Sequence, residues 1–316
     1  MRFAVVALAV LAGCVELGVV SDGTSISVGK PSMGRIVDGA RMPDRGQGFF
    51  TREIWKTRGN RYGTDELVDL LTAVARRTEP KNTGIRLVVA DLSGRGGGAA
   101  HQWHRSHQSG RDVDLLYYVR DKAGKAVEND AMHVFRGDLV AVDGTGLTVD
   151  IPRVWNLVRE LLTAPEAPVQ WVFMYQPIAN AIVEHAIKIG EPEALVERAK
   201  KACKQPGDSA PHNDHMHVRV YCAVSDRQYG CLDIGPMELL AEREADFQTQ
   251  QALVASALES RVPTFTEAVQ AQLPSVTPQP AVIAPSTPSS APAGDLRSIQ
   301  RLLRTGAYRF DLWRWR

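Results

Sequence analysis

Six of the eight histidines in the chain fall in two short segments, "HQWHRSHQ" at 101–108 and "HNDHMH" at 212–217. One aspartate, Asp114, follows the first segment closely. Imidazole nitrogens and carboxylate oxygens are common protein ligands of zinc. The two segments therefore predict a metal site. A set of two histidines and one aspartate would leave a tetrahedral position open for water, as a catalytic zinc requires.

Other kinds of site have little support in the sequence. The zinc-protease signature H-E-x-x-H is absent, which excludes a site carried on one helix. The glycine-rich run "SGRGGG" at 93–98 does not match a dinucleotide fingerprint, and we interpret it as a flexible loop. A net charge of +1 gives no indication of a nucleic-acid partner. His133 and His185 stand alone and are interpreted as surface or satisfied core groups.

Strand periodicity explains how the two histidine segments could meet. In an extended strand, side chains two residues apart face the same side. The stretch "HMHVRVY" then places His215, His217, Arg219 and Tyr221 on one face. The stretch "DVDLLYY" does the same for Asp112 and Asp114. Two neighbouring strands with these polar faces would bring His107, Asp114 and His217 to a single ion.

The surrounding elements predict an α+β domain. Strands are expected at 85–92, 112–119, 169–175 and 215–222, and helices at 64–77, 152–162, 177–190, 192–203 and 236–261. Thr64 is the expected cap of the first helix, and Pro152 fits the first turn of the second. The elements alternate without a strict βαβ rhythm. We therefore expect a small antiparallel sheet that carries the His/Asp/His zinc site, flanked by helices, over residues 25–248.

The N-terminal segment, 1–14, has the pattern of an export signal. Arg2 precedes the apolar run Phe3–Val10, and "LAGC" at 11–14 resembles a bacterial lipobox with Cys14 as the lipidated residue. This predicts a lipid anchor at Cys14 and a place in the cell envelope. An ordinary cleaved signal peptide is an alternative. An uncleaved anchor is another, but Glu16 interrupts the apolar run before the roughly 20 residues needed to span a membrane.

The C-terminal part changes in composition. Residues 249–294 are expected to hold the end of a helix and then a linker rich in Pro, Ser and Ala, which cannot bury a core. Residues 295–316 carry six arginines against two aspartates and end in aromatic residues. This basic tail fits either an anionic membrane or wall surface or a solvated terminus.

The four cysteines are too few for a disulfide scaffold. If Cys14 is lipidated, three remain, and they allow three pairings. Cys222 and Cys231 are close enough in sequence to close a small loop, so we expect a disulfide between them. Cys203 is then left over.

Two local stretches carry a specific family resemblance. "SHQSGRDVD" at 106–114 and "HNDHMHVRV" at 212–220 resemble the signature segments of the penicillin-insensitive murein endopeptidases, and "RYGTDELVDLL" at 61–71 is also similar. These enzymes belong with the lysostaphin, D-alanyl-D-alanine peptidase and hedgehog-type metallopeptidases, whose ligand pattern is His-x₆-Asp followed by His-x-His. The resemblance covers about 25–231.

The resemblance implies roles for individual residues. His107, Asp114 and His217 match the zinc ligands. His215 matches the residue thought to act on the bound water or to stabilise the oxyanion, while His104 and His212 match histidines that ring the site. Related dipeptidases use a glutamate three residues before the last ligand. Asp214 stands there and is a second candidate base.

Arg111 departs from the pattern beside the ligands. This cation either meets a substrate carboxylate or is a solvated loop residue, and the solvated loop residue is the preferred interpretation.

The activity implied by the resemblance is the hydrolysis of murein cross-links between D-alanine and meso-diaminopimelate by zinc-activated water in the periplasm. The partners would then be peptidoglycan stem peptides. Two alternatives remain. One is a D,D-carboxypeptidase of the same fold, and the other is a non-catalytic zinc-binding envelope protein. The additional histidines argue against the second, because a structural zinc site needs four ligands and no free base.

Overall fold

The computed structural model describes residues 21–99 and 104–259 of the chain. The chain divides into two compact units, Met1–Asp246 and Phe247–Arg316. The sheet and the site described below belong to the first unit. The predicted signal peptide and lipobox at 1–14, the Pro-rich linker at 272–294 and the basic tail at 295–316 lie outside the described residues.

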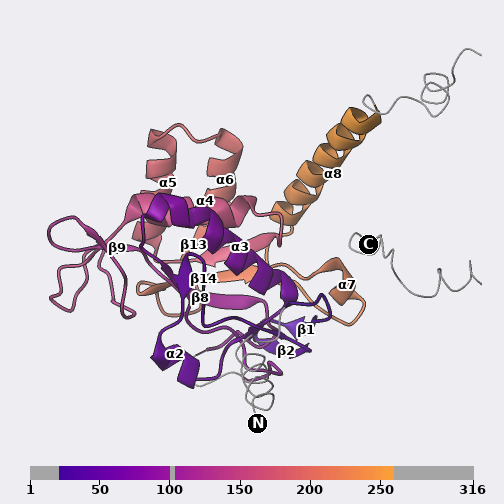
Figure 1. The fold of residues 1–316 in the computed structure, drawn as a ribbon, viewed down its shortest axis with the longest axis horizontal. Helices are drawn as coiled ribbons and strands as arrows, with labels where there is room; N and C mark the ends of the chain where they lie inside the picture. Colours follow the sequence, from indigo (N-terminus) through magenta and orange to yellow (C-terminus); the bar gives the residue numbers. More distant parts are fainter. Residues whose placement is uncertain (1–20, 100–103, 260–316) are drawn as a thin grey trace, which may run out of the picture. The chain divides into compact units, whose positions relative to one another are not determined.

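A four-stranded sheet lies at the centre of the first unit, with α3 in front of it in Figure 1. Its strand order is β13-β12-β14-β8. The strands are β8 Asp112–Leu116, β12 Val169–Phe173, β13 Cys203–Lys204 and β14 His215–Val220. β14 pairs antiparallel with both β12 and β8, which confirms that the two polar strands are neighbours.

The sheet is mixed rather than wholly antiparallel, which corrects the sequence-based expectation. β13 runs parallel to β12. Parallel neighbours need a crossover connection, and the helical segment between β12 and β13 supplies it. The strand expected at 85–92 is also shorter than predicted: only Leu87–Val88 forms a strand, β7, and Val89 adds an isolated bridge to Leu115.

The predicted helices are confirmed. The helices of the described residues are α2 Glu53–Thr57, α3 Asp65–Asn82, α4 Ile151–Thr163, α5 Gln176–Lys188, α6 Glu193–Ala202, α7 Val224–Arg227 and α8 Glu238–Glu259. The Thr64 side chain caps α3 by accepting a hydrogen bond from the Leu67 amide, and α3 continues five residues beyond the expected end. Asp150 caps α4, whose first turn contains a proline.

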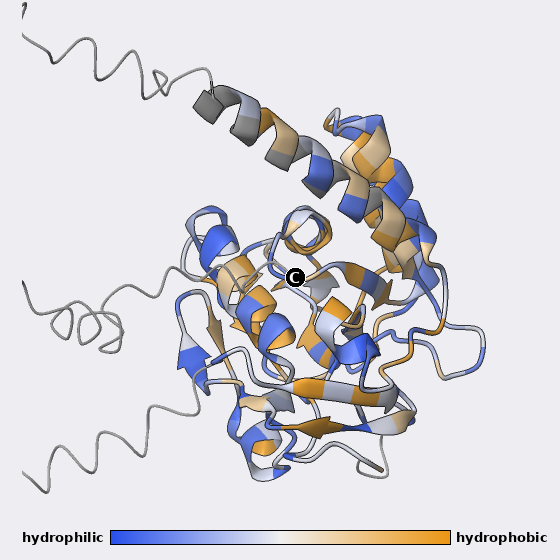
Figure 2. Ribbon diagram, turned by 90° about the vertical axis from the view of Figure 1, so that its right-hand side faces the viewer, coloured by the Kyte–Doolittle hydropathy of each residue, from blue (hydrophilic) through white to orange (hydrophobic). Residues whose placement is uncertain are grey.

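The hydrophobic core fills the space between one face of the sheet and the helices. Val113 and Leu115 of β8 and Met216 and Val218 of β14 are all fully buried there. Residues of α3, α4, α5 and α6 complete the same cluster. Figure 2 shows hydrophobic and hydrophilic residues alternating along strands and around helices. The core thus lies on the face of the sheet opposite to the polar side chains of β8 and β14.

Short strands surround the main sheet. They are β1 Ile26–Lys30, β2 Met33–Val37, β3 Ala40–Arg41, β4 Arg45–Gly46, β5 Phe49–Phe50, β6 Tyr62–Gly63, β9 Val119–Arg120, β10 Ala126–Val127 and β11 Thr148–Val149. β1 and β2 form an antiparallel hairpin that was not predicted. β9 pairs with both β10 and β11 in a separate small sheet.

The cysteine prediction is confirmed. Cys222 and Cys231 form a disulfide, and Cys203 is a buried free thiol. Across the part of the chain that the structure describes, none of the helices has the length and apolar character needed to cross a membrane.

Candidate metal centre

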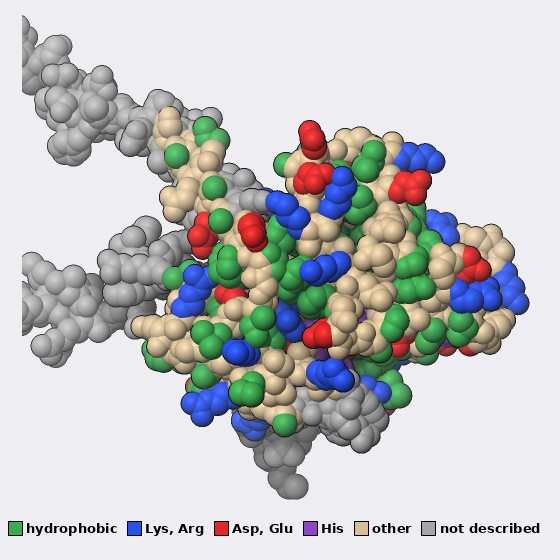
Figure 3. Space-filling model, turned by 180° about the vertical axis from the view of Figure 1, so that it is seen from behind, with side chains coloured by type: hydrophobic (Ala, Val, Ile, Leu, Met, Phe, Trp, Pro, Cys, Tyr) green, Lys and Arg blue, Asp and Glu red, His purple; other side chains and the backbone are tan. Residues whose placement is uncertain are grey.

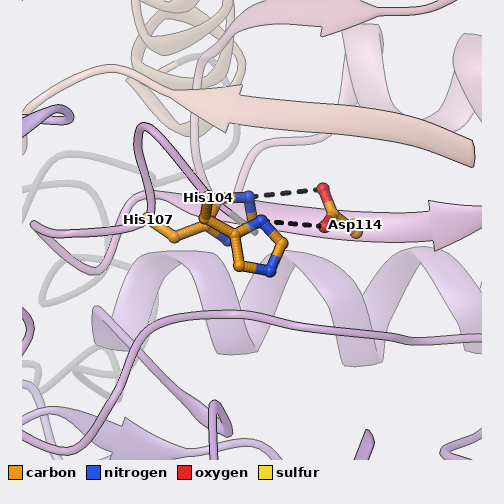
Figure 4. A group of neighbouring side chains, drawn as sticks. All are labelled: His104, His107 and Asp114. Atoms are coloured by element: carbon orange, nitrogen blue, oxygen red, sulfur yellow. Dashed lines mark ion pairs between the residues drawn. The ribbon is translucent and has the colours of Figure 1, made fainter. Parts of the chain in front are cut away.

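The Asp114 carboxylate is the centre of the site. It is fully buried, and neither of its oxygens has a hydrogen-bond partner among the described residues. Four imidazole nitrogens face it, and two of the rings are drawn in Figure 4. The distances are 3.3 Å from His107 Nε2, 3.6 Å from His104 Nδ1, 3.5 Å from His215 Nε2 and 3.6 Å from His217 Nδ1.

Each of these four rings uses its other nitrogen to bond an oxygen. The pairs are His107 Nδ1 with the Leu92 carbonyl at 3.0 Å, His104 Nε2 with Asp91 at 3.0 Å, His215 Nδ1 with Asp214 at 2.7 Å and His217 Nε2 with Asp112 at 2.8 Å. A carbonyl or carboxylate oxygen accepts, so the outer nitrogen donates. The inner nitrogen of a neutral ring then keeps its lone pair for a metal or a proton.

The strand register brings the two polar stretches together. His217 lies opposite Asp114, and Arg219 lies opposite Asp112. The period of two therefore places these four side chains on one face, as predicted. His107 comes from the loop before β8 and has a left-handed backbone, with φ of 66°. Its amide donates to Asp112 at 3.2 Å, which fixes this uncommon conformation.

Charge and burial give the histidines of the site different pKa values. Burial lowers the pKa of His107, but the Asp114 carboxylate outweighs burial and raises it to about 9. Burial lowers the pKa of His217 and of His212 to about 4. His217 and His212 are therefore neutral near pH 7, which is the form that binds a metal or accepts a proton.

His212 lies beside the cluster rather than in it. Its ring centroid is 5.0 Å from that of His215 and 5.6 Å from that of His217. Its Nδ1 is buried without a hydrogen-bond partner among the described residues. The Tyr117 hydroxyl holds the backbone here by donating to the His212 carbonyl at 2.8 Å.

The donor set fits a divalent cation. Ligand atoms of His104, His107 and Asp114 all lie within 4.8 Å of one another. Besides both Asp114 oxygens, His107 Nε2 is buried without a hydrogen-bond partner in the described part of the chain. Buried polar atoms aimed at one point are costly unless a further group satisfies them. Two or three imidazoles with one carboxylate are a ligand set typical of zinc.

The site is largely enclosed. The side chains of His104 and His215 are 11% and 18% exposed, whereas that of Asp114 is 1% exposed. Seen from behind, the molecule shows histidine only as small areas between charged and apolar side chains (Figure 3). Solvent therefore reaches the cluster from the side of His215 and His104.

Arg111 is neither a solvated loop residue nor a surface cation for a substrate, which corrects the preferred interpretation. It is fully buried and donates to Asp233 at 2.8 Å and to the carbonyls of Val220 and Leu232 at 3.2 and 2.9 Å. The partner carboxylate comes from a position 122 residues later in the chain. The guanidinium joins the start of β8 to the segment that follows the disulfide loop.

The role of Asp91 was missed from the sequence. Its Oδ2 accepts from His104 and, at 2.7 Å, from Arg58. The available signal was an aspartate at the end of the apolar run "IRLVVAD". His133 agrees with its interpretation as a satisfied group, because its two ring nitrogens contact Asp130 and Asp143.

Comparison with known protein families finds a match over most of the chain. Residues 27–249 match the family model of penicillin-insensitive murein endopeptidases. The chain belongs to this family. The match includes both histidine segments and the whole four-stranded sheet.

Individual relatives are distant. The chain is 26% identical over 212 residues to a penicillin-insensitive murein endopeptidase of Haemophilus influenzae, covering 64% of this chain and 65% of that protein. A protein of the same name from Klebsiella pneumoniae is 25% identical over 220 residues, 68% of this chain and 72% of its own length. An Escherichia coli protein of that name is 24% identical over 206 residues, which cover 63% of this chain and 68% of that protein. The chain thus spans just under two thirds of the Haemophilus protein.

Proposed function

We propose that this protein is a zinc-dependent murein endopeptidase that hydrolyses cross-links between D-alanine and meso-diaminopimelate in peptidoglycan. Family membership and the names of the relatives support the murein substrate. One observation carries the metal chemistry: four imidazoles converge on the buried Asp114 carboxylate, each with its outer nitrogen bonded to an oxygen.

His107, Asp114 and His217 are the proposed zinc ligands. His107 and Asp114 belong, with His104, to the group of donor atoms within 4.8 Å of one another, and His217 has a lowered pKa that keeps its ring neutral. His104 is the alternative third ligand, because its Nδ1 lies at the same 3.6 Å from Asp114 as His217 Nδ1. Zinc bound to these residues would supply a Lewis acid for the scissile carbonyl and lower the pKa of a water molecule.

His215 and His212 are the proposed proton-transfer groups. Burial lowers the pKa of His215, but Asp114 and Asp214 outweigh it, and the pKa is raised. Asp214 therefore acts through His215, by holding Nδ1 and orienting the ring. A protonated His215 can stabilise an oxyanion or give its proton to the leaving amine, while the neutral His212 can accept a proton. His104, held by Asp91, lines the same site.

A purified muropeptide digest tests the reaction. Conversion of cross-linked dimers to monomers, followed by mass spectrometry, is the expected result, and an Asp114→Ala variant is the inactive control. Release of terminal D-alanine from monomers, with dimers intact, would indicate a D,D-carboxypeptidase instead. Bound zinc without any hydrolysis would indicate a non-catalytic zinc protein.

A peptidoglycan substrate places the protein in the cell envelope, and we propose that lipid on Cys14 anchors it there. Replacement Cys14→Ser is expected to move the protein from the membrane fraction to the soluble envelope fraction. Removal of residues 295–316 is expected to weaken retention at low salt and to leave hydrolysis of soluble muropeptides unchanged. A Cys14→Ser protein that still sediments with membranes would contradict the anchor.

A further inference from the structure

The Asp112 carboxylate contacts two histidines of the site at once. It is fully buried. Its Oδ1 accepts from His217 Nε2 at 2.8 Å and from Arg219 Nε at 2.6 Å. Its Oδ2 accepts from the backbone amide of His107 at 3.2 Å. One carboxylate therefore joins a strand residue to a loop residue 110 positions earlier in the sequence, 217 against 107.

The two contacts fix different properties of the two histidines. The bond from His217 Nε2 places the ring proton on that nitrogen and leaves Nδ1, 3.6 Å from Asp114, as the available donor atom. The bond from the His107 amide holds a backbone with φ of 66°, which few residues other than glycine adopt. That backbone in turn sets where the His107 ring enters the site.

We propose that Asp112 is a positioning residue of the metal centre, which sets the tautomer of His217 and the backbone conformation of His107 together. The inference rests on the proposed metal function. It assigns to Asp112 no contact with the metal or the substrate. Its effect is to pre-organise both histidines before metal binds.

Arg219 supports Asp112 from the next strand. It lies opposite Asp112 in the register, and its guanidinium also lies over the Phe173 ring, 5.4 Å from the centroid. Arg219 and His217 both donate to Oδ1, and the His107 amide donates to Oδ2. All three partners are donors, so the side chain must offer an acceptor on both oxygens.

Replacement Asp112→Asn separates the two contacts without changing the shape of the side chain. An amide has one acceptor oxygen, whereas the native contacts need two. If the oxygen faces His217, the NH₂ group opposes the His107 amide. If the oxygen faces His107, the NH₂ group donates to His217 Nε2, and the ring proton moves to Nδ1, where it blocks metal binding.

The test measures metal binding rather than activity. Zinc affinity, by competition with a chromogenic chelator, is expected to fall by roughly 10–100-fold in Asp112→Asn, the range found for outer partners of metal ligands. The cobalt-substituted variant is expected to show an altered d–d absorption spectrum. In a His217→Ala background, Asp112→Asn should cause a smaller further loss of zinc affinity. The contact of Asp112 with the His217 ring is then already absent, and only its contact with the His107 amide remains.

Asp150→Asn is the matched control. Asp150 is also fully buried, bonds Arg120 and Arg153 and caps α4, but its hydrogen-bond partners do not include the site histidines. This variant is expected to lower the melting temperature and to leave zinc affinity and the cobalt spectrum unchanged. Should Asp112→Asn fail to fold, Arg219→Gln removes one partner of the same carboxylate and is expected to weaken zinc binding by a measurable factor below about tenfold.

Unchanged zinc affinity and cobalt spectrum in Asp112→Asn, or unchanged affinity in Arg219→Gln where the first variant does not fold, would overturn the inference and leave the proposed function intact. Absence of zinc binding by the wild-type protein would overturn both. Zinc binding without muropeptide hydrolysis would count against the endopeptidase alone, because the affinity measurement on Asp112 does not depend on activity.

Discussion

The two faces of β8 and β14 differ although the same two strands form both. On one face, Val113, Leu115, Met216 and Val218 pack in the apolar core. The other face carries the charged and imidazole side chains that alternate in sequence with these apolar residues. They are Asp112 and Asp114 on β8 and His215, His217 and Arg219 on β14. Asp112 and Asp114 are as deeply buried as Val113 and Leu115, so exposure to solvent does not explain the difference along β8.

The difference shows that one face of the sheet stabilises the fold and the other carries the candidate site. Burial of the apolar face stabilises the folded state by roughly 25 cal/mol for each Å² of apolar surface removed from water. The polar face buries a carboxylate whose oxygens have no hydrogen-bond partner among the described residues, so its charge must be offset by a protonated imidazole such as His107 or by a bound cation. Changes to the two faces should therefore affect different measurements.

Asp114→Ala should have the largest effect on function. It removes the carboxylate that all four imidazoles face, together with the charge that would compensate a divalent cation. We expect loss of both metal content and muropeptide hydrolysis, measured by elemental analysis and by the dimer assay. Full zinc occupancy in this variant would show that Asp114 is not a metal ligand.

His215→Ala should retain metal and lose rate. His215 is the most exposed of the four rings around Asp114 and is bonded to Asp214, as a proton-transfer group would be. We expect a rate lower by roughly 10²–10⁴-fold, the range for general acid–base groups, with zinc stoichiometry unchanged. If Asp214→Ala proves far more damaging than His215→Ala, the two roles are reversed.

Metal affinity should depend on pH through His107. Its pKa in the metal-free protein is raised from 6.5 to about 9, so below that value a proton must leave before metal binds. We expect zinc affinity to rise with pH up to about 9, by at most roughly tenfold per unit for one released proton. Chelator competition at several pH values measures this slope.

The stability of the metal-free protein should depend on pH in the opposite direction. A folded-state pKa above the unfolded value contributes stability that is fully present below pH 6.5 and is lost as the pH rises through about 9. Denaturant melts of the metal-free protein across this window check the sign. Equal slopes with and without zinc would contradict a metal contact at His107.

Leu115→Ala should change the apolar face alone and have the smallest effect on metal binding. Leu115 is fully buried and adjoins Asp114 in sequence, but it points into the core. We expect the free energy of unfolding to fall by about 2–5 kcal/mol, with zinc affinity within twofold of wild type. Denaturant melts and chelator competition on the same sample compare the two faces directly.

Much of the polar face of the sheet could be predicted from the sequence. The period of two correctly paired His215 with His217 and Asp112 with Asp114, because strand geometry is local. Thr64 and Pro152 likewise marked helix starts through local backbone chemistry. The Cys222–Cys231 disulfide followed from short separation in sequence.

The errors arose where distant parts of the chain meet. Arg111 is buried because Asp233 and the Leu232 carbonyl lie beside it, which its neighbours in sequence do not indicate. The direction of β13 depends on the crossover through α5 and α6. Asp91 contacts His104 and Arg58 across loops, and neither spacing has a regular period.

The strand order also has a consequence for the time course of folding. β14 is the last of the four strands to be synthesised, yet it lies between β12 and β8. Until β14 is inserted, no strand joins β12 to β8, and the loop carrying His107 has no His217 to meet. Such long-range pairing is slow to form. A chain whose last strand is not yet inserted therefore has neither the complete four-stranded sheet nor the complete histidine cluster around Asp114.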